Sequence, residues 1–157
     1  MSQLANSEYI ISDLRHQPRF KATVAHRIWQ AWWIGQDVPL SYIEGRVEED
    51  LTSNRIPFAL VAHRSKVFLG TASVIAHDMD ERPQYSPWVA LVWVDPEHRG
   101  SGVGSALVRA AGDAAFKLGH SPVYLCATPE KSSFYRRLGW EAIEDGVSGM
   151  NVFMCSQ

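Results

Sequence analysis

The sequence predicts a mixed α/β domain in which helices flank a largely antiparallel sheet. A short apolar run from Trp88 to Val94 is rich in β-branched and aromatic residues, which favours a strand buried on both faces. From Val103 to Leu118, apolar residues recur every three or four positions, the period of one face of a helix. Two further apolar runs, Pro57 to Ala62 and Val67 to Ala76, are joined by a polar turn and indicate an antiparallel hairpin.

The other segments extend this into the order β-α-α-β-β-β-α-β-α-β-β. Residues 9–14 are predicted as the first strand. Apolar residues in steps of four predict a helix over 18–33 that begins near Pro18 and buries Trp29 and Trp32. Pro39 opens a second helix over 40–51, whose acidic residues are expected to face solvent. We expect a strand over 122–127, a helix over 131–138 and two last strands near 140–143 and 151–154.

Composition places the chain among ordinary globular proteins. At 157 residues, with 46% hydrophobic and 20% charged residues, it is expected to form a single domain. A formal net charge of -2 provides no basic surface for nucleic acid, and no apolar run is long enough to span a bilayer. The polar opening from Met1 to Glu8 does not resemble a signal peptide, and two cysteines make no disulfide framework. We therefore expect a cytoplasmic protein.

A glycine-rich loop separates the central strand from the helix that follows, with glycines at 100, 102 and 104. The start of a helix has free N–H groups and a partial positive charge, and glycine has no Cβ to keep a phosphate away. Arg99 adds a forked cation. A plain reversing turn is the simpler alternative, but the flanking strand, helix and arginine favour phosphate binding. No lysine lies between Lys66 and Lys117 to complete a Walker loop, and the glycine spacing does not fit a dinucleotide fingerprint.

The pattern Arg99-x-x-Gly102-x-Gly104 after Val-Asp-Pro-Glu-His resembles the acetyl-coenzyme A loop of the GCN5-related N-acetyltransferase (GNAT) superfamily. The segment Ser133 to Trp140 is similar to a second motif of that family, in which a tyrosine faces the thioester sulfur. The resemblance covers about residues 67–153. It implies the GNAT acyl-CoA N-acyltransferase fold, acetyl-CoA as co-substrate, and transfer of the acetyl group to a primary amine by direct attack in a ternary complex.

The resemblance also implies roles for individual residues. Tyr135 would serve the leaving coenzyme A thiolate as an acid or hydrogen-bond donor. The helices over 18–33 and 40–51 would cover the acceptor, with Trp33 and Glu44 as candidate substrate contacts. Dimers are frequent in the family, so a homodimer stays open. The residues expected to bind the cofactor are Val92, Trp93, Val94, Arg99, Gly100, Ser101, Gly102, Val103, Gly104 and Thr128.

An amine with a pKa near ~10.4 must lose a proton before it attacks a thioester. Many members of the family use a glutamate on the central strand, but residues 89–92 carry no carboxylate here. The remaining candidates are Glu44, His77, Asp78 and Asp80, acting directly or through water, or an acceptor with a lowered pKa. We favour Asp78 or Asp80, because their loop lies at a sheet end where acids can attract a cationic acceptor. The simpler alternative is a solvated loop tip.

Two other functions stay open at this point. The absent strand glutamate permits a sensor that binds acyl-CoA without turnover, and a third class is an acyltransferase for another acyl group or acceptor. Polyamines, aminoglycosides, amino acids, peptide N-termini and lysine side chains are all candidate acceptors. Cys126 is predicted to be a small core residue, since nothing nearby in the sequence suggests a lowered thiol pKa. The six histidines form no ligand pattern, so no metal is expected.

Overall fold

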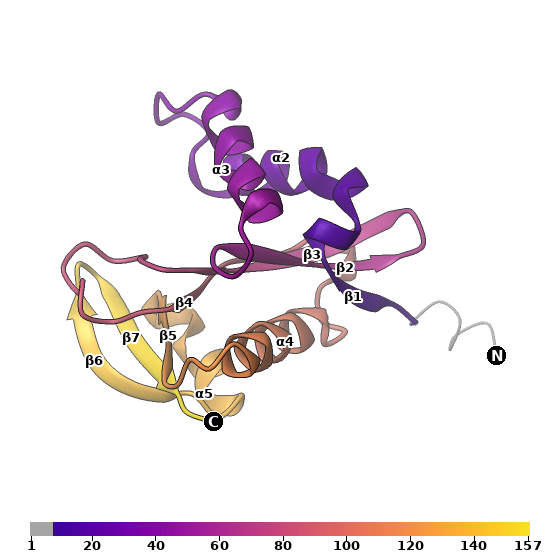
Figure 1. Ribbon diagram of the computed structural model, residues 1–157. Coiled ribbons are helices and arrows are strands. Elements are labelled where there is room, and N and C mark those ends of the chain that lie inside the picture. The colour runs from indigo at the N-terminus through magenta and orange to yellow at the C-terminus, as the bar shows by residue number, and fades with distance from the viewer. Residues whose placement is uncertain (1–7) are drawn as a thin grey trace.

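A seven-stranded sheet in the order β1-β2-β3-β4-β5-β7-β6 runs through the computed structural model, which describes residues 8–157 (Figure 1). Of the polar opening discussed above, all but Glu8 lies outside the described residues. In the part of the chain that the structure describes, no helix combines the length and apolar character needed to cross a membrane.

The predicted order of strands and helices is confirmed. The strands are β1 (Ile10–Asp13), β2 (Phe58–Arg64), β3 (Val67–Ile75), β4 (Trp88–Val94), β5 (Val123–Ala127), β6 (Glu141–Val147) and β7 (Met150–Cys155). The helices are α2 (Lys21–Trp32), α3 (Leu40–Thr52), α4 (Val103–Lys117) and α5 (Ser132–Arg137). Short 3-10 turns occupy Leu14–His16, Pro18–Phe20, Pro96–His98 and Pro129–Lys131. The first strand is therefore shorter than predicted, since Leu14 already belongs to a turn.

Helices cover both faces of the sheet, with α2 and α3 on one side and α4 and α5 on the other (Figure 1). Strand β2 shows why, because its side chains alternate between two apolar clusters. Phe58 and Leu60 pack into the cluster that includes α4, whereas Ala59 and Val61 pack into the cluster beneath α2 and α3. A strand that is apolar at every position is stable only when both faces are covered.

The sheet opens between β4 and β5. These two strands form the parallel pair of the sheet and are in register only at Trp88 and Tyr124. The β3–β4 register shifts between Thr71 and Ser73, and Leu91 has a positive φ of 56°. This bulge in β4 bends the strand away from its neighbour. The predicted burial on both faces is therefore right only for residues 88–90, while residues 91–94 are half-buried beside the opening.

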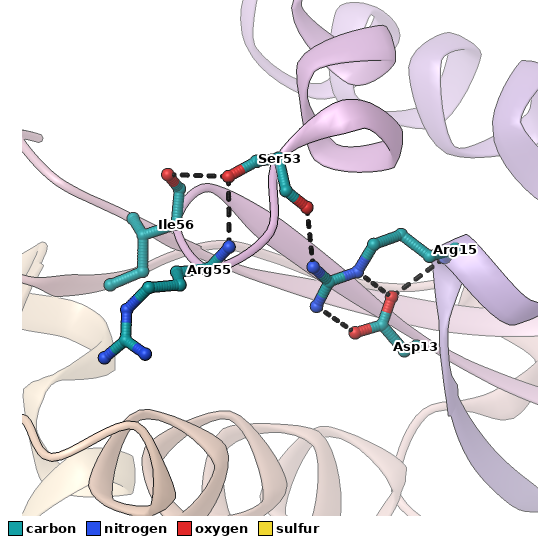
Figure 2. A network of polar contacts seen from close by, with 5 residues as sticks. All are labelled: Asp13, Arg15, Ser53, Arg55 and Ile56. Atoms are coloured by element: carbon teal, nitrogen blue, oxygen red, sulfur yellow. Dashed lines mark hydrogen bonds and ion pairs between the residues drawn. The ribbon is translucent and has the colours of Figure 1, made fainter.

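A polar network holds the end of α3 against the beginning of the sheet (Figure 2). The Arg15 guanidinium donates from Nε and Nη2 to the carboxylate of Asp13, at 2.9 and 2.6 Å, and from Nη1 to the Ser53 carbonyl at 2.7 Å. The Ser53 hydroxyl in turn donates to the carbonyl of Ile56 and accepts from the N–H of Arg55. Burial alone would raise the pKa of Asp13, but the Arg15 hydrogen bonds outweigh it and lower that pKa. The last turn of α3 is thus tied to β1.

The tryptophans at the end of α2 differ in burial. Trp29 is half-buried under the helix and donates from Nε1 to the Val38 carbonyl at 2.6 Å. Trp32 is 38% exposed, so its predicted place in the core is wrong. Its ring instead meets Trp33 and Trp93 edge-on, with centroids 6.4 and 6.5 Å away. Helix α2 ends at Trp32, where the sheet opens and offers no closed surface to cover the indole.

Candidate functional site

Two cavities meet at the opening between β4 and β5. Cavity A has a volume of about 810 Å³ and is lined by the glycine-rich loop, the start of α4 and one side of α5. Cavity B has a volume of about 560 Å³ and is lined by residues 89–92 of β4, residues 125–127 of β5 and the loop that precedes β4. Trp32, Val92, Lys131 and Tyr135 line both cavities. The two cavities are therefore neighbouring compartments of one site.

The N-terminus of α4 faces cavity A without a side-chain cap. Gly102 precedes the helix with a φ of +89°, and a Cβ added there would meet no atom within 4 Å. The first helical hydrogen bond runs from the N–H of Ala106 to the carbonyl of Gly102, so the N–H groups of the first turn lack helical partners. Open space in front of free N–H groups and a positive helix end suits an anion such as phosphate.

Three cations line cavity A. The Arg99 guanidinium lies 4.6 Å from the centre of the Trp93 ring and donates from Nε to the carbonyl of Val94 at 2.8 Å. Lys131 and Arg137 also line this cavity, although neither was predicted as a site residue. Lys131 lies four residues before Tyr135, and that spacing on a helical segment indicates a shared face. Cavity A can thus receive a ligand with several negative charges.

The edge of β4 that borders the opening carries backbone groups that do not pair with β3, although the Val94 carbonyl accepts a hydrogen bond from Arg99. The N–H of Asp95 donates to the carbonyl of Leu69 on the β3 side, at 2.9 Å. Because successive residues of a strand turn their backbone groups to opposite edges, those of Val94 and Val92 face the opening. The backbone of Trp93 pairs with Thr71 of β3, so this residue lines cavity A with its indole.

Tyr135 lies where the two cavities join. Its side chain comes from α5 and is 9% exposed, with the ring of Phe134 edge-on at a centroid distance of 5.0 Å. Burial raises the pKa of the Tyr135 phenol, and the neighbouring Cys126 adds to that shift. The phenol therefore stays protonated at neutral pH and can donate a hydrogen bond or a proton.

The loop over 76–87 is anchored and is not a free tip. Arg82 donates from Nη2 to Oε1 of Glu144 on β6 at 2.6 Å, and the Tyr85 hydroxyl donates to Oε2 of the same carboxylate at 2.6 Å. These hydrogen bonds lower the pKa of Glu144 to about 2, and the one from Arg82 contributes most. The anchored loop places Asp78 and Asp80 in the wall of cavity B.

Asp78 contacts the opposite wall of cavity B through a cysteine. The Cys126 thiol donates to Oδ2 of Asp78 across 3.4 Å. Asp78 is exposed as a residue, but partial loss of hydration raises the pKa of its carboxyl, and this hydrogen bond partly offsets the shift. Burial and the nearby carboxylate raise the pKa of Cys126 to about 12, so its thiolate does not form at neutral pH. Cys126 was predicted as a core residue, but it is half-buried and lines the cavity.

The other predicted cofactor residues fall into two groups. Gly100, Gly102 and Gly104 line cavity A. The Ser101 hydroxyl instead donates to the carbonyl of His98 at 2.9 Å, and the Val103 side chain is buried in the core. Ser101 and Val103 can therefore contribute to cavity A only through their backbone.

The remaining predicted residues lie on other walls. Thr128 lines cavity B but not cavity A, and its carbonyl accepts a hydrogen bond from the Ser132 hydroxyl at 3.0 Å. Trp33, a candidate substrate contact, lines cavity B. Glu44 is exposed on α3 and borders a separate hollow together with Lys21 and Glu48. The fold thus does not bring Glu44 to the cavities at the opening, because it lies on the outer face of its helix.

A third cavity, cavity C, has a volume of about 290 Å³ and continues from cavity B toward α3. The two share Trp33, Asp78, Asp80 and Leu91 as walls. Asp50 lines cavity C and is only 7% exposed, so its predicted position on a solvated face is wrong. Burial, followed by the charge of Glu49, raises the pKa of Asp50 to about 7.

The sequence did contain a signal for Asp50. It stands seven residues after Ile43 and three after Val47, and both of those side chains are buried. This spacing puts Asp50 on the apolar face of α3. Across residues 8–157, the His, Cys, Asp and Glu side chains form no group that could hold a metal ion.

Comparison with known proteins shows the family and the fold of this chain. The family described as "Acetyltransferase (GNAT) domain" matches residues 57–142, which is more than half of the chain. A curated relative, GCN5-related N-acetyltransferase 2, chloroplastic, of Arabidopsis thaliana, is 38% identical over 64 residues. That match covers 39% of this chain, and the chain spans only 25% of the relative.

Solved structures share the fold along nearly the whole chain. An aminoglycoside 6'-N-acetyltransferase complexed with coenzyme A has a TM-score of 0.73 at 15% identity, covering 94% of this chain and 96% of that one. Glucosamine-6-phosphate N-acetyltransferase from Arabidopsis thaliana has a TM-score of 0.68 at 21% identity, with 89% and 96% covered. An acyl-CoA N-acyltransferase from Pseudomonas aeruginosa has a TM-score of 0.67 at 20% identity, with 95% and 99% covered.

Proposed function

This chain belongs to the GNAT acetyltransferase domain family, and on that premise we propose that it acts as a single-domain N-acetyltransferase. It would transfer the acetyl group of acetyl-CoA to a primary amine by direct attack in a ternary complex. The position of Tyr135 at the junction of cavities A and B carries the proposal. A thioester held in cavity A would have its sulfur beside this phenol and its carbonyl turned toward cavity B.

Cavity A fits coenzyme A in charge and in shape. The uncapped start of α4 and the open space at Gly102 suit the diphosphate, and Arg99, Lys131 and Arg137 supply positive charge. The backbone of Val92 and the N–H of Val94 on the open edge of β4 suit the amide groups of the pantetheine arm, which need one donor and one acceptor each.

The reaction then needs three events in cavity B. The acceptor ammonium gives a proton to Asp78, directly or through water, and the free amine attacks the acetyl carbonyl. The backbone N–H of Val92 would donate to the developing oxyanion. When the C–S bond breaks, the coenzyme A thiolate takes the proton of Tyr135. The nitrogen loses its second proton as it becomes an amide, and that proton returns through water to the Tyr135 phenolate, while Asp78 gives its proton to solvent. The products are the acetylated amine and free coenzyme A.

The state of Cys126 supports direct attack over an acetylated enzyme. A thiol with a pKa of about 12 is a poor nucleophile near neutral pH, and this is the cysteine that lines cavity B. A ternary mechanism also uses the two adjoining cavities at the same time, one for each substrate.

The test is thiol release from acetyl-CoA in the presence of a panel of primary amines. We expect turnover with at least one amine. Double-reciprocal plots of initial rate against amine concentration, measured at several acetyl-CoA concentrations, should intersect. Parallel plots would contradict the ternary mechanism. Coenzyme A binding by calorimetry without thiol release across the panel would contradict the enzyme and favour a binding module.

A further inference from the structure

Cavity C has a strongly acidic lining for its size. Carboxylates of Glu49, Asp50, Asp78 and Asp80 line it, against one guanidinium from Arg46. Nε of Arg46 lies 3.4 Å from Oε1 of Glu49, on the exposed side of α3. Glu49, Asp78 and Asp80 are exposed residues, whereas Asp50 is buried among apolar walls that keep the local dielectric low.

One buried polar atom in this cavity lacks a partner, and a largely buried carboxyl lines the same cavity. Ser73 of β3 is 1% exposed, and its Oγ has no hydrogen-bond partner within residues 8–157. The carboxylate of Asp50 makes no hydrogen bond or ion pair with any other described residue, although it is 7% exposed. Buried hydroxyl and carboxyl groups are almost always hydrogen-bonded in folded proteins. A buried hydroxyl without a partner, in a cavity that the Asp50 carboxyl also lines, indicates a ligand that supplies the missing donor.

Asp50 cannot easily turn away to find another partner. The network at Arg15 and Ser53 ties the end of α3 to β1, three residues beyond Asp50 (Figure 2). The charged groups that act on the Asp50 carboxyl are Glu49, Arg46, Asp13 and Arg15. Of these, Arg15 already donates to Asp13 and to the Ser53 carbonyl. The backbone of α3 beside Asp50 is thus held in place, and Asp50 lines cavity C.

We propose that cavity C binds a second ammonium group of the acceptor, so that the substrate is a diamine or polyamine acetylated at one end. An ammonium has three donors and no acceptor, which matches the Asp50 carboxylate and the Ser73 hydroxyl oxygen. Trp33, shared by cavities B and C, supplies an aromatic wall for a cation, and Leu91 borders the passage between them. An alkyl spacer in that passage would place the first amine beside β4.

The assignment of which amine is acetylated rests on the proposed function, but the binding of the second ammonium does not. The direct test is calorimetry of coenzyme A-loaded protein with 1,4-diaminobutane and spermidine, against n-butylamine as the monoamine control. We expect the diamine and the polyamine to bind about tenfold more tightly or better, since a hydrogen bond to a buried charge contributes that much. Equal affinity for the diamines and n-butylamine would overturn the inference.

Variants separate cavity C from charge in general. Asp50→Asn and Ser73→Ala should each reduce the preference for diamines, measured as the ratio of the Kd for n-butylamine to the Kd for 1,4-diaminobutane. In Asp50→Asn this ratio should fall close to one. Glu48→Gln removes an acid from the exposed face of the same helix, where it pairs with Lys21, and should keep the preference. If Asp50→Asn does not fold, the Ser73→Ala result decides. An unchanged preference in Asp50→Asn, or in Ser73→Ala where that variant decides, would overturn the inference.

Failure of the two proposals can be distinguished. Diamine binding that depends on Asp50, without thiol release from acetyl-CoA, would contradict the acetyltransferase activity and leave the cavity C assignment standing. Thiol release with equal kcat/KM for n-butylamine and 1,4-diaminobutane would support the activity and contradict the assignment.

Discussion

The Cys126 thiol on β5 and the Asp78 carboxylate on the loop before β4 meet across cavity B, with Sγ 3.4 Å from Oδ2. The contact links the two sides of the opening and sets the protonation of both groups. The thiol stabilises the ionised carboxylate as a donor, while the carboxylate helps to keep the thiol protonated. A cysteine in this wall thus acts as a hydrogen-bond donor in the proposed mechanism.

If Asp78 accepts the proton of the amine, kcat/KM falls as the pH drops through its pKa. Cys126→Ala removes a donor that lowers this pKa, so the acidic limb of the kcat/KM profile should move to higher pH with turnover retained. Asp78→Asn should lower kcat/KM about 100-fold and remove the limb. The control is Asp80→Asn, which changes the other favoured carboxylate. Loss of the limb in Asp80→Asn alone would assign the base to Asp80.

Coenzyme A affinity should depend on the bare backbone at Gly102. Gly102→Val puts a branched side chain where the diphosphate is proposed to lie, and we expect binding to fall below detection in calorimetry. Gly119→Val is the matched control, because Gly119 follows the other end of α4 with a φ of +94° and equally open space. Each variant should lose about 1–2 kcal/mol or more of stability to backbone strain. Retained affinity in Gly102→Val, or equal loss in both, would refute the phosphate site.

Tyr135→Phe should lower kcat about tenfold or more while leaving the Kd for acetyl-CoA nearly unchanged. The phenol touches the leaving sulfur only in the proposed reaction, so its loss affects the transition state more than binding. Tyr124→Phe removes a hydroxyl outside the three cavities and should keep normal rates. A Tyr135→Phe enzyme with normal kcat would remove the acid role.

Asp50 should make the protein less stable as the pH rises from about 4 to 7. Its pKa in the folded chain is about 7 against 3.8 in the reference state, so the folded protein holds this proton more tightly than the unfolded chain. Stability that depends on this proton is present at low pH and is lost as the pH rises. The free energy of unfolding of Asp50→Asn minus that of the wild type should therefore be larger at pH 8 than at pH 4, by a few kcal/mol. Urea unfolding at the two pH values measures this, and an equal difference at both would contradict it.

Much of the fold was predictable from pattern, because apolar periodicity reports which face of an element is covered. The run from Trp88 to Val94 forms a strand over those same residues, and the spacing after Gly102 predicted α4 nearly to its ends. Trp32 was mispredicted for a related reason. A prediction from periodicity holds only if the sheet covers the whole apolar face of the helix. Here the sheet no longer covers that face at Trp32, because it opens between β4 and β5.

The candidate site was predictable only in part. Residues adjacent in the sequence, such as the glycine-rich loop and the Phe134-Tyr135 pair, carry a local signal that survives without the fold. Asp50 and Ser73 lie on different elements, and their common cavity exists only once α3 packs on the sheet.

The sequence by itself determined the elements, their order and the family, because these follow from local periodicity and from short motifs. Only the tertiary structure decided that Tyr135 joins two cavities, that Glu44 lies outside them and that Asp50 shares a cavity with Ser73. Each of these depends on how β4 bends away from β5 and on where α3 ends. Both are set by long-range packing and hydrogen bonds, such as the contact from Arg15 to Ser53, that no stretch of the chain encodes alone.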